Sequence, residues 1–216
     1  MRRTIYLVGG GGHCVSAIDV IEQEDKYKIG GILDLPEKVG QKVLGYEIIG
    51  DDSQIKKYAR TDNYFLITMG HIKTSKKRRQ LAEMISAFGG RLATIISPSA
   101  YVSKHSRVGE GTIVGHSSNI SAGVSVGINC IINTKAVIEH NVRLGDYCHI
   151  STGAVLNGES RLENGVFLGS NSMVRQDVRI GEGSVIGAGV SVFNDLPSRS
   201  YLKFPRQIFY PEDNQK

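Results

Sequence analysis

A histidine in the second half of the chain has the surroundings of a catalytic base. His140 follows the apolar pair Val137 and Ile138 and precedes a polar residue, Asn141. An imidazole with the ordinary pKa of about 6.5 is largely neutral at cellular pH and can take a proton from an amine or a hydroxyl. A lone histidine is more often an ordinary surface residue, so the case for catalysis depends on where the fold places His140.

A glycine-rich turn near the N-terminus is the second candidate for chemistry. The apolar run from Thr4 to Val8 leads into four glycines and His13, and apolar residues at helical spacing follow from Cys14 to Gln23. Backbone amides at such a strand–helix junction bind phosphate groups, and Asp34, at the end of the next apolar run, is placed to hydrogen-bond a ribose or a base. The pattern favours a site that binds the diphosphate of a single nucleotide over a tight turn that binds no ligand. The residues of this predicted site are Gly10, Gly11, Gly12, His13 and Asp34.

A repeat with a period of six organises the second half of the chain. Sixteen aliphatic residues follow one another at this interval without a break. They are Val102, Val108, Val114, Ile120, Val126, Ile132, Ile138, Leu144, Ile150, Leu156, Leu162, Leu168, Val174, Ile180, Ile186 and Val192. A period of six is typical of hexapeptide-repeat β-helices, in which three hexapeptides form one triangular coil. The stretch therefore predicts about five coils, with His140 projecting outward at a corner of the middle one.

Two further features of the repeat support a β-helix. A small or medium uncharged residue stands two positions before each aliphatic residue, which predicts a second inward column. Cys130 and Cys148 belong to this column and should stack on adjacent coils as free, buried thiols. The residue after the aliphatic one is often glycine, as at Gly109 and Gly169, which suits a corner where a side chain would clash or φ must be positive.

The N-terminal part predicts a small α/β domain. Strands are expected over residues 4–8, 28–33, 64–69 and 91–96, and the main helices over 14–23 and 74–88. A short helix capped by Asp52 or Ser53 should precede the third strand. The order is that of half a Rossmann fold. We assign residues 1–96 to a nucleotide-binding Rossmann-like domain, 97–192 to the β-helix and 193–216 to an irregular C-terminal segment.

Composition restricts the classes of function. Of the 216 residues, 22% are charged and 40% hydrophobic, and the formal charge is +5, which suits anionic ligands such as nucleotides or coenzyme A. The basic run from Lys73 to Arg79 has no interleaved aromatic residues, so we expect a solvated helix face and no nucleic-acid partner. No apolar run could span a membrane and none resembles a signal peptide, which predicts a cytoplasmic protein without a membrane partner.

These elements together resemble a known family over about residues 3–195. The matching motifs are the strand before Gly10-Gly11-Gly12-His13, the corner Ile138-Glu139-His140, the segment from Gly145 to Ala154 and the segment from Phe167 to Ser172. The family comprises bacterial sugar acyltransferases that join a nucleotide-binding domain to a left-handed hexapeptide β-helix. Its members include sialic acid O-acetyltransferases and N-acetyltransferases of nucleotide-linked 4-amino-6-deoxysugars. The left hand is implied by the family, because ordinary crossovers are right-handed.

The resemblance implies a homotrimer that transfers an acetyl group from acetyl-CoA, with no metal. His140 would be the general base, and the backbone N–H of Gly158 would stabilise the oxyanion of the tetrahedral intermediate. His149 would contact the acyl donor or position the substrate, and Asn133 would lie beside the acceptor. The remaining implied contacts are Glu139 to the substrate, and Ser170, Gly187 and Arg206 to acetyl-CoA.

Three positions depart from the family pattern. Asn141 stands where relatives usually have an acidic residue that orients the base; an amide oxygen fixes the tautomer but cannot offset the charge, a task that Glu139 could take over. Lys203-Phe204-Pro205-Arg206-Gln207 replaces the usual Gly-x-Pro-Ala-Lys near the coenzyme A nucleotide. Cys14 replaces a glycine and could crowd the phosphate loop.

The leading hypothesis is acetyl-CoA-dependent N-acetylation of a nucleotide-linked 4-amino-4,6-dideoxysugar for surface glycans such as lipopolysaccharide. The glycine turn and Asp34 favour it, since O-acetylation of free sialic acid, the close alternative, needs no nucleotide site. A zinc enzyme using His105 and His140 lacks a third ligand, because Gly145 occupies the expected position. An inactive β-helix scaffold is the remaining alternative, and Asn141 gives it some support.

Overall fold

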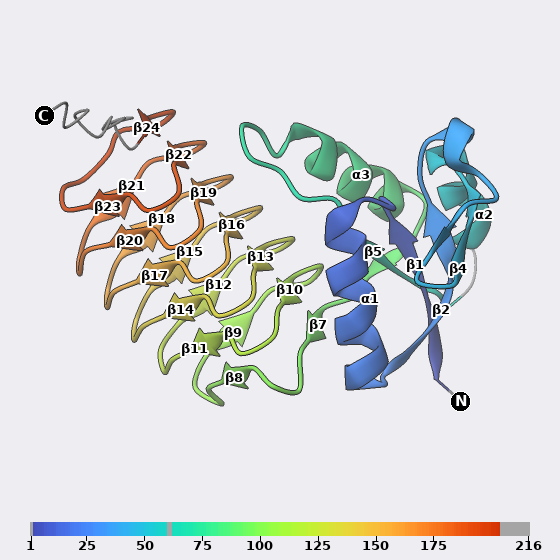
Figure 1. Ribbon diagram of the computed structural model, residues 1–216, viewed down its shortest axis with the longest axis horizontal. Helices are drawn as coiled ribbons and strands as arrows, with labels where there is room; N and C mark the ends of the chain where they lie inside the picture. Colours follow the sequence, from blue (N-terminus) through green and yellow to red (C-terminus); the bar gives the residue numbers. More distant parts are fainter. Residues whose placement is uncertain (1, 60–61, 204–216) are drawn as a thin grey trace, which may run out of the picture.

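The computed structural model describes residues 2–59 and 62–203, which form an N-terminal α/β unit and a triangular β-helix (Figure 1). In the α/β unit, β1 (Arg3–Val8) lies between β2 (Tyr27–Leu33) and β5 (Tyr64–Ile67), and all three run parallel. The sheet order is β3-β4-β2-β1-β5-β6. The outer strands are β3 (Lys42–Val43), β4 (Tyr46–Gly50) and β6 (Arg91–Leu92), and only β3 is antiparallel to its neighbour.

This strand order creates a crevice at one edge of the sheet. The chain passes from β1 to β2 on one side and to β5 on the other, so the carboxyl ends of β1 and β5 form a topological switch point, where open α/β sheets bind ligands. Helix α1 (Gly12–Glu24) begins there, two residues earlier than the sequence pattern predicts. The sheet therefore places the glycine-rich turn at its ligand-binding edge.

The other helices follow the predicted order with small shifts. A 3₁₀ turn (Asp52–Gln54) and the single-turn α2 (Ile55–Tyr58) follow β4, and the cap is Asp51, one residue before the predicted Asp52 or Ser53. Helix α3 (Lys76–Ala87) is capped by Phe88, and the next residue, Gly89, has a φ of +75°, the left-handed conformation in which a glycine stops a helix.

The β-helix has three flat faces, each a parallel sheet of two-residue strands. The first face contains β7 (Ile95–Ile96), β10 (Ile113–Val114), β13 (Ile131–Ile132), β16 (His149–Ile150), β19 (Phe167–Leu168), β22 (Val185–Ile186) and β24 (Tyr201–Leu202). The second face contains β8 (Tyr101–Val102), β11 (Asn119–Ile120), β14 (Val137–Ile138), β17 (Val155–Leu156), β20 (Met173–Val174) and β23 (Ser191–Val192). The third face contains β9 (Arg107–Val108), β12 (Ser125–Val126), β15 (Arg143–Leu144), β18 (Arg161–Leu162) and β21 (Arg179–Ile180). The predicted left-handed hexapeptide β-helix is confirmed.

Both predicted inward columns form the core of the β-helix. The core cluster alternates large aliphatic side chains such as Ile132 and Ile150 with smaller ones such as Cys130 and Cys148, all fully buried. Both cysteines are free. Several hydroxyls in the second column donate to carbonyls of nearby corners, as from Ser118 to Gly115 (2.8 Å), so their burial costs little; the hydroxyl of Ser160 is an exception without a partner among the described residues.

The corners show why glycine recurs after the aliphatic residue. A Cβ atom on Gly169 would lie 2.5 Å from the backbone nitrogen of Ala188 on the next coil, so close approach of the coils excludes a side chain there. Positive φ occurs two residues later, for example at Asn171 (+53°). Of the two reasons that the sequence suggested for these glycines, close approach is the one that applies.

The ladder extends beyond both ends of the stretch that shows the period. The single strand predicted over residues 91–96 is divided, because β6 joins the N-terminal sheet whereas β7 pairs with β10 and starts the β-helix. At the other end, β24 pairs with β22, so part of the segment predicted to be irregular continues the first face. Pro98 lies in a turn and Pro197 directly precedes one, so the sequence pattern around these prolines does not reveal that the ladder continues.

The basic run before and within α3 is not simply a solvated face. Arg78 is 1% exposed, and its guanidinium donates to the carbonyls of Ile67 (2.9 Å), Met69 (2.6 Å) and Asn129 (2.8 Å). Asn129 lies in the β-helix, so Arg78 joins the two units. A second link is His116, whose Nε2 lies 2.8 Å from Oδ2 of Asp19 on α1. No helix among the described residues has the length and apolar character of a membrane span.

Candidate active site

His140 lies at the edge between the second and third faces, two residues after the end of β14. Its side chain is exposed, and its imidazole rests on Gly158, at the same edge one coil further along. A Cβ atom on Gly158 would lie 2.4 Å from Cε1 and 2.5 Å from Nε2 of His140, so the absence of a side chain is what admits the ring. The ring projects outward from the coil, as the repeat predicts.

The backbone N–H of Gly158 is an unused hydrogen-bond donor beside this ring, for no residue in 2–59 or 62–203 accepts from it. At some other corners a side-chain oxygen satisfies the equivalent N–H, as in the bonds from Thr134 to Asn133 (2.9 Å) and from Asp146 to Asn164 (2.7 Å). A free backbone donor next to an exposed imidazole can stabilise a developing oxyanion while the imidazole accepts a proton.

Asn141 and Glu139 both turn away from the imidazole. Asn141 has a φ of +60°, and its Oδ1 lies over Gly123 on the preceding coil, 2.2 Å from where a Cβ atom on that glycine would stand. Glu139 instead accepts a long hydrogen bond (3.4 Å) from Ser121. Within the described part of this chain neither side chain hydrogen-bonds to His140, so the expected orientation of the base by Asn141 or Glu139 is not seen.

The glycine turn presents free amides at the switch-point crevice. The N–H groups of Gly11, Gly12 and His13 have no acceptor among the described residues, and Gly11 is the cap residue of α1. The crevice has a volume of about 240 Å³ and its lining includes Gly9, Asp34, Ser53 and Met69. Free amides at a helix N-terminus beside a cavity suit a phosphorylated ligand.

Asp34 does not point freely into this crevice. Its carboxylate accepts from the N–H of Gly10 (2.8 Å), the N–H of Leu35 (2.8 Å) and the ammonium of Lys38 (3.0 Å). Burial raises the pKa of Asp34, but these hydrogen bonds outweigh it and hold the pKa below its ordinary value. Asp34 therefore braces the turn and occupies the amide of Gly10, which cannot at the same time bind a phosphate.

Cys14 does not crowd the turn, contrary to expectation. Its side chain is fully buried in the apolar cluster between α1 and the sheet. Burial raises the pKa of the Cys14 thiol to about 11, so it is an inert packing group.

His149 belongs to a group of three histidines where the β-helix meets the N-terminal unit; His71 and His149 are buried and His13 is half-buried. Its ring centre lies 5.5 Å from that of His71 and 6.1 Å from that of His13, with the edge of Phe167 packed against it. Burial lowers the pKa of His13 and His149 to about 4 and that of His71 to about 3, so all three are neutral at cellular pH. His71 is a site residue that the sequence analysis missed, although its place directly after the strand end at Gly70 was an available signal.

The hydrogen bond of His149 determines its tautomer. Nδ1 lies 2.8 Å from the carbonyl oxygen of His71, which can only accept, so Nδ1 carries the proton. Nε2 is then an acceptor, is buried and has no partner among the described residues. Neutral His149, which lies in β16 on the first face, can therefore accept a hydrogen bond from a ligand N–H or O–H.

The predicted site residues form two groups that lie far apart on a single chain, on different sides of the β-helix. His140, Asn141, Gly158 and Glu139 lie at the edge between the second and third faces. Asn133, Ser170 and Gly187 follow β13, β19 and β22, at the edge between the first and second faces, and His149 lies on the first face itself. In a triangular prism the edge that carries His140 is opposite the face that carries His149. A site containing both needs a second copy of the chain.

The other residues predicted to contact substrate or acetyl-CoA differ in whether their polar groups are free for a ligand. The carboxamide of Asn133 accepts from the N–H of Thr134 (2.9 Å), and the N–H of Gly187 donates to Leu202 (2.8 Å), so neither is free for a ligand at these atoms. Ser170 is exposed. Arg206 lies outside the described residues. Residues 2–59 and 62–203 contain no group of three or more His, Cys, Asp or Glu side chains arranged to hold a metal ion.

Comparison with solved structures identifies the family. A mutant of perosamine N-acetyltransferase from Caulobacter crescentus, solved with CoA and GDP-perosamine, superposes with a TM-score of 0.86; the two chains are 30% identical, and the match covers 92% of each. The chain belongs to the bacterial hexapeptide-repeat sugar acyltransferases. In this acyltransferase, residues 4–85 also match the PglD N-terminal domain and residues 159–194 the bacterial transferase hexapeptide repeats.

A second relative supports the same family. The acetyltransferase domain of PglB from Neisseria gonorrhoeae, solved with acetyl coenzyme A, has a TM-score of 0.82 and 27% identity to this acyltransferase, with 91% of this chain and 94% of that chain covered. No curated protein matches the acyltransferase by sequence.

Proposed function

We propose that this acyltransferase N-acetylates a nucleotide-linked 4-amino-4,6-dideoxysugar, with acetyl-CoA as the donor. Two observations carry the proposal: the free amides of Gly11, Gly12 and His13 at the start of α1, and a relative, similar over 92% of each chain, that was solved with CoA and GDP-perosamine. Free amides at a helix N-terminus suit the diphosphate of a nucleotide sugar. An acceptor without a nucleotide would leave these amides without a role. A cytoplasmic step in the synthesis of surface glycans, such as lipopolysaccharide, suits this substrate.

In the proposed reaction, His140 is the general base. The amino nitrogen of the sugar attacks the thioester carbonyl carbon, and the imidazole accepts the proton that the nitrogen loses. The N–H of Gly158, free beside the ring, stabilises the negative charge on the carbonyl oxygen. The intermediate then breaks its C–S bond, and the imidazolium returns the proton to the departing thiolate. The products are the N-acetylated sugar and coenzyme A.

We further propose that the active unit is a homotrimer with shared sites. His140 and Gly158 of one subunit would face the first face of the next, which carries His149 beside the glycine turn. Such a site explains why the two groups of predicted residues lie on opposite sides of a single β-helix. Each closed trimer would then contain three equivalent sites.

The reaction is tested by measuring thiol release from acetyl-CoA with a panel of acceptors. The panel contains GDP-, UDP- and dTDP-linked 4-amino-4,6-dideoxysugars, together with free and CMP-linked sialic acid. We expect turnover of one nucleotide aminosugar by the wild type and its loss in His140→Ala. Turnover with sialic acid alone would instead show that the protein is an O-acetyltransferase. Release of thiol that is unchanged in His140→Ala would overturn the role of His140.

The shared site is tested by mixing two variants. His140→Ala and His149→Ala should each be inactive as homotrimers. Co-refolded in equal amounts, they should regain about a quarter of wild-type activity, because random assembly leaves both histidines intact in one site of four. A mixture as inactive as its components would show that each site lies within one subunit.

A further inference from the structure

A small crevice lies at the carboxyl ends of β1, β2 and β5, next to the glycine turn. Its volume of about 240 Å³ is below the roughly 300 to 1,000 Å³ of pockets that enclose a whole small-molecule ligand. Apolar side chains at the ends of the strands and on α3 form its walls, among them Val8, Leu35, Met69 and Leu81. Apolar walls suit a flat ring, so the crevice can hold the base of a nucleotide but not the whole nucleotide.

An ion pair belongs to the polar part of this lining. The ammonium of Lys77 on α3 lies 2.8 Å from Oδ2 of Asp52, in the turn that follows β4. Both residues line the crevice, and both side chains remain partly exposed. The ammonium has further protons to donate, and the carboxylate has further lone pairs that can accept. The pair therefore offers a ligand a donor and an acceptor side by side.

The pairing edge of guanine matches this order of donor and acceptor. The edge presents the acceptor O6 and then two donors, N1–H and N2–H. O6 can accept from Lys77, while the two donors reach the two oxygens of Asp52 in charge-assisted hydrogen bonds. Uracil and thymine present an acceptor, a donor and a second acceptor, so their O2 would face the carboxylate with no proton between them. Adenine and cytosine offer the carboxylate one donor group instead of two. A site built around two donors disfavours bases that lack one of them.

We propose that the acceptor is a guanosine diphosphate sugar and that Asp52, together with Lys77, selects its base. The position of the crevice supports this assignment. Gly9 lines the crevice, and the free amides begin two residues later at Gly11, so a base in the crevice and a diphosphate at the amides can belong to one ligand. The inference rests on the proposed function, since it names the nucleotide of that acceptor.

The other two carboxylates of the crevice are held by their own loops. Oδ1 of Asp51 accepts from the N–H (2.9 Å) and the hydroxyl (2.6 Å) of Ser53. Asp34 accepts from the N–H groups of Gly10 and Leu35 and braces the glycine turn. Asp52 is held by Lys77, the residue that supplies the donor for O6. Asp52 is therefore the carboxylate best placed to read a base.

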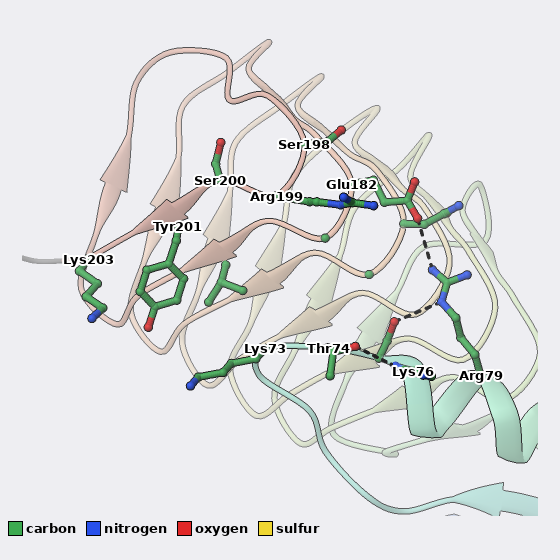
Figure 2. A pocket seen from close by; sticks show the side chains of 15 residues that line it. Lys73, Thr74, Lys76, Arg79, Glu182, Ser198, Arg199, Ser200, Tyr201 and Lys203 are labelled. Atoms are coloured by element: carbon green, nitrogen blue, oxygen red, sulfur yellow. Dashed lines mark hydrogen bonds and ion pairs between the residues drawn. The ribbon is translucent and has the colours of Figure 1, made fainter.

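A larger groove between α3 and the last coils is less suitable for this base (Figure 2). Lys76 lines the groove, whereas Lys77 lines the crevice. The one acid of the groove lining, Glu182, lies 3.9 Å from Arg79, and the other charged groups of the lining are cations. Cations bind phosphate groups but do not read the donors of a base. The groove also contains Lys203, which begins the segment that the family resemblance places near the nucleotide of coenzyme A.

Calorimetric titration with nucleoside diphosphates tests the inference without acetyl-CoA. The panel contains GDP, UDP, dTDP and the diphosphates of inosine and xanthosine. Inosine lacks the N2 amino group of guanosine, and xanthosine carries a carbonyl oxygen in its place. We expect the wild type to bind GDP at least about tenfold more tightly than each of the others, because each loses at least one charge-assisted hydrogen bond to Asp52.

The variant Asp52→Asn tests the role of the carboxylate. The substitution keeps the shape of the side chain but replaces one acceptor oxygen with a donor NH₂ group. We expect Asp52→Asn to bind GDP about tenfold more weakly than the wild type and to prefer xanthosine diphosphate to GDP, since the amide can donate to the added carbonyl oxygen. The matched control is Asp25→Asn, which breaks the ion pair of Asp25 with Arg2 (2.6 Å) outside the crevice and should keep the GDP affinity within about twofold.

The outcomes separate this inference from the proposed function. Wild-type protein that binds none of the five nucleotides would overturn the nucleotide-linked acceptor itself. Wild-type protein that binds UDP or dTDP as tightly as GDP would overturn the selection of guanine and leave a nucleotide-linked acceptor standing. Equal GDP affinities of Asp52→Asn and Asp25→Asn would overturn the role of Asp52, because any change would then reflect overall charge and not the crevice.

Discussion

The imidazole of His140 lies so close to Gly158 that a methyl group on this glycine would be 2.4 Å from the ring. The two residues are 18 positions apart and occupy the same corner of adjacent coils. Their contact sets the position of the base, since neither Asn141 nor Glu139 holds the ring within the chain. The same glycine supplies the free N–H, so one residue positions the base and offers the oxyanion donor.

Gly158→Ala should abolish most of the activity of a folded protein. The new methyl group would displace the exposed ring of His140, and a displacement of about 1 Å costs on the order of 100-fold in kcat. Steady-state kinetics and thermal denaturation measure the two effects. Thr152→Ala, at the equivalent corner position six residues earlier, is the control and should keep both kcat and Tm. Activity of Gly158→Ala within about threefold of wild type would show that the ring position is not critical.

We expect Asn141 to stabilise the backbone conformation at this corner and not to take part in catalysis by His140. The left-handed backbone conformation of Asn141 is energetically unfavourable for alanine. Asn141→Ala should therefore lower the free energy of unfolding by about 1 kcal/mol, whereas Asn141→Gly should not. Both variants should keep kcat within about twofold once folded. Asn171→Ala, with a φ of +53°, should lose similar stability. A tenfold fall in kcat for Asn141→Gly would instead assign the amide to catalysis.

The hydrogen bonds of Arg78 should contribute most of the polar stabilisation between the two units. Arg78→Met would leave the carbonyls of Ile67, Met69 and Asn129 without their donor, at a cost of about 3 kcal/mol or more in the free energy of unfolding. Urea denaturation measures the loss. The control is Lys77→Met, which removes an exposed ion pair with Asp52 and should cost less than about 1 kcal/mol. Equal losses in the two variants would contradict this role.

The buried histidines should make the protein sensitive to mild acid. The folded-state pKa values of His13, His71 and His149 lie near 4, 3 and 4, below the unfolded value of about 6.5. Unfolding therefore takes up protons below about pH 6.5. The contribution of these histidines to the free energy of unfolding is fully present above this pH and is lost as the pH falls toward 4. Each histidine contributes about 1 kcal/mol of loss between pH 7 and pH 5.5.

Urea denaturation at both pH values measures this loss in the wild type and in His71→Asn. The variant should show a smaller difference between the two pH values, because one of the three buried rings is absent. A pH dependence identical to that of the wild type would show that His71 does not remain neutral in the folded protein.

The repeat could be predicted because its contacts are local and periodic. Each residue of the β-helix meets its counterpart 18 positions away, as Ile113 meets Ile131, so a column of like residues in the sequence becomes a column in space. The outward placement of His140 and the burial of Cys130 and Cys148 follow from counting alone. The glycine turn was similarly visible, because a strand, its turn and the following helix are contiguous in the chain.

The meeting of the two units could not be predicted in this way. Arg78 bonds to Asn129, 51 positions away, and His149 to His71, 78 positions away, and no period relates these pairs. The packing of α1 and α3 against the first face decides which histidines are buried, which N–H groups stay free and on which side of the prism each group of site residues lies. These properties depend on desolvation and on the direction of side chains, which exist only once distant segments have packed together.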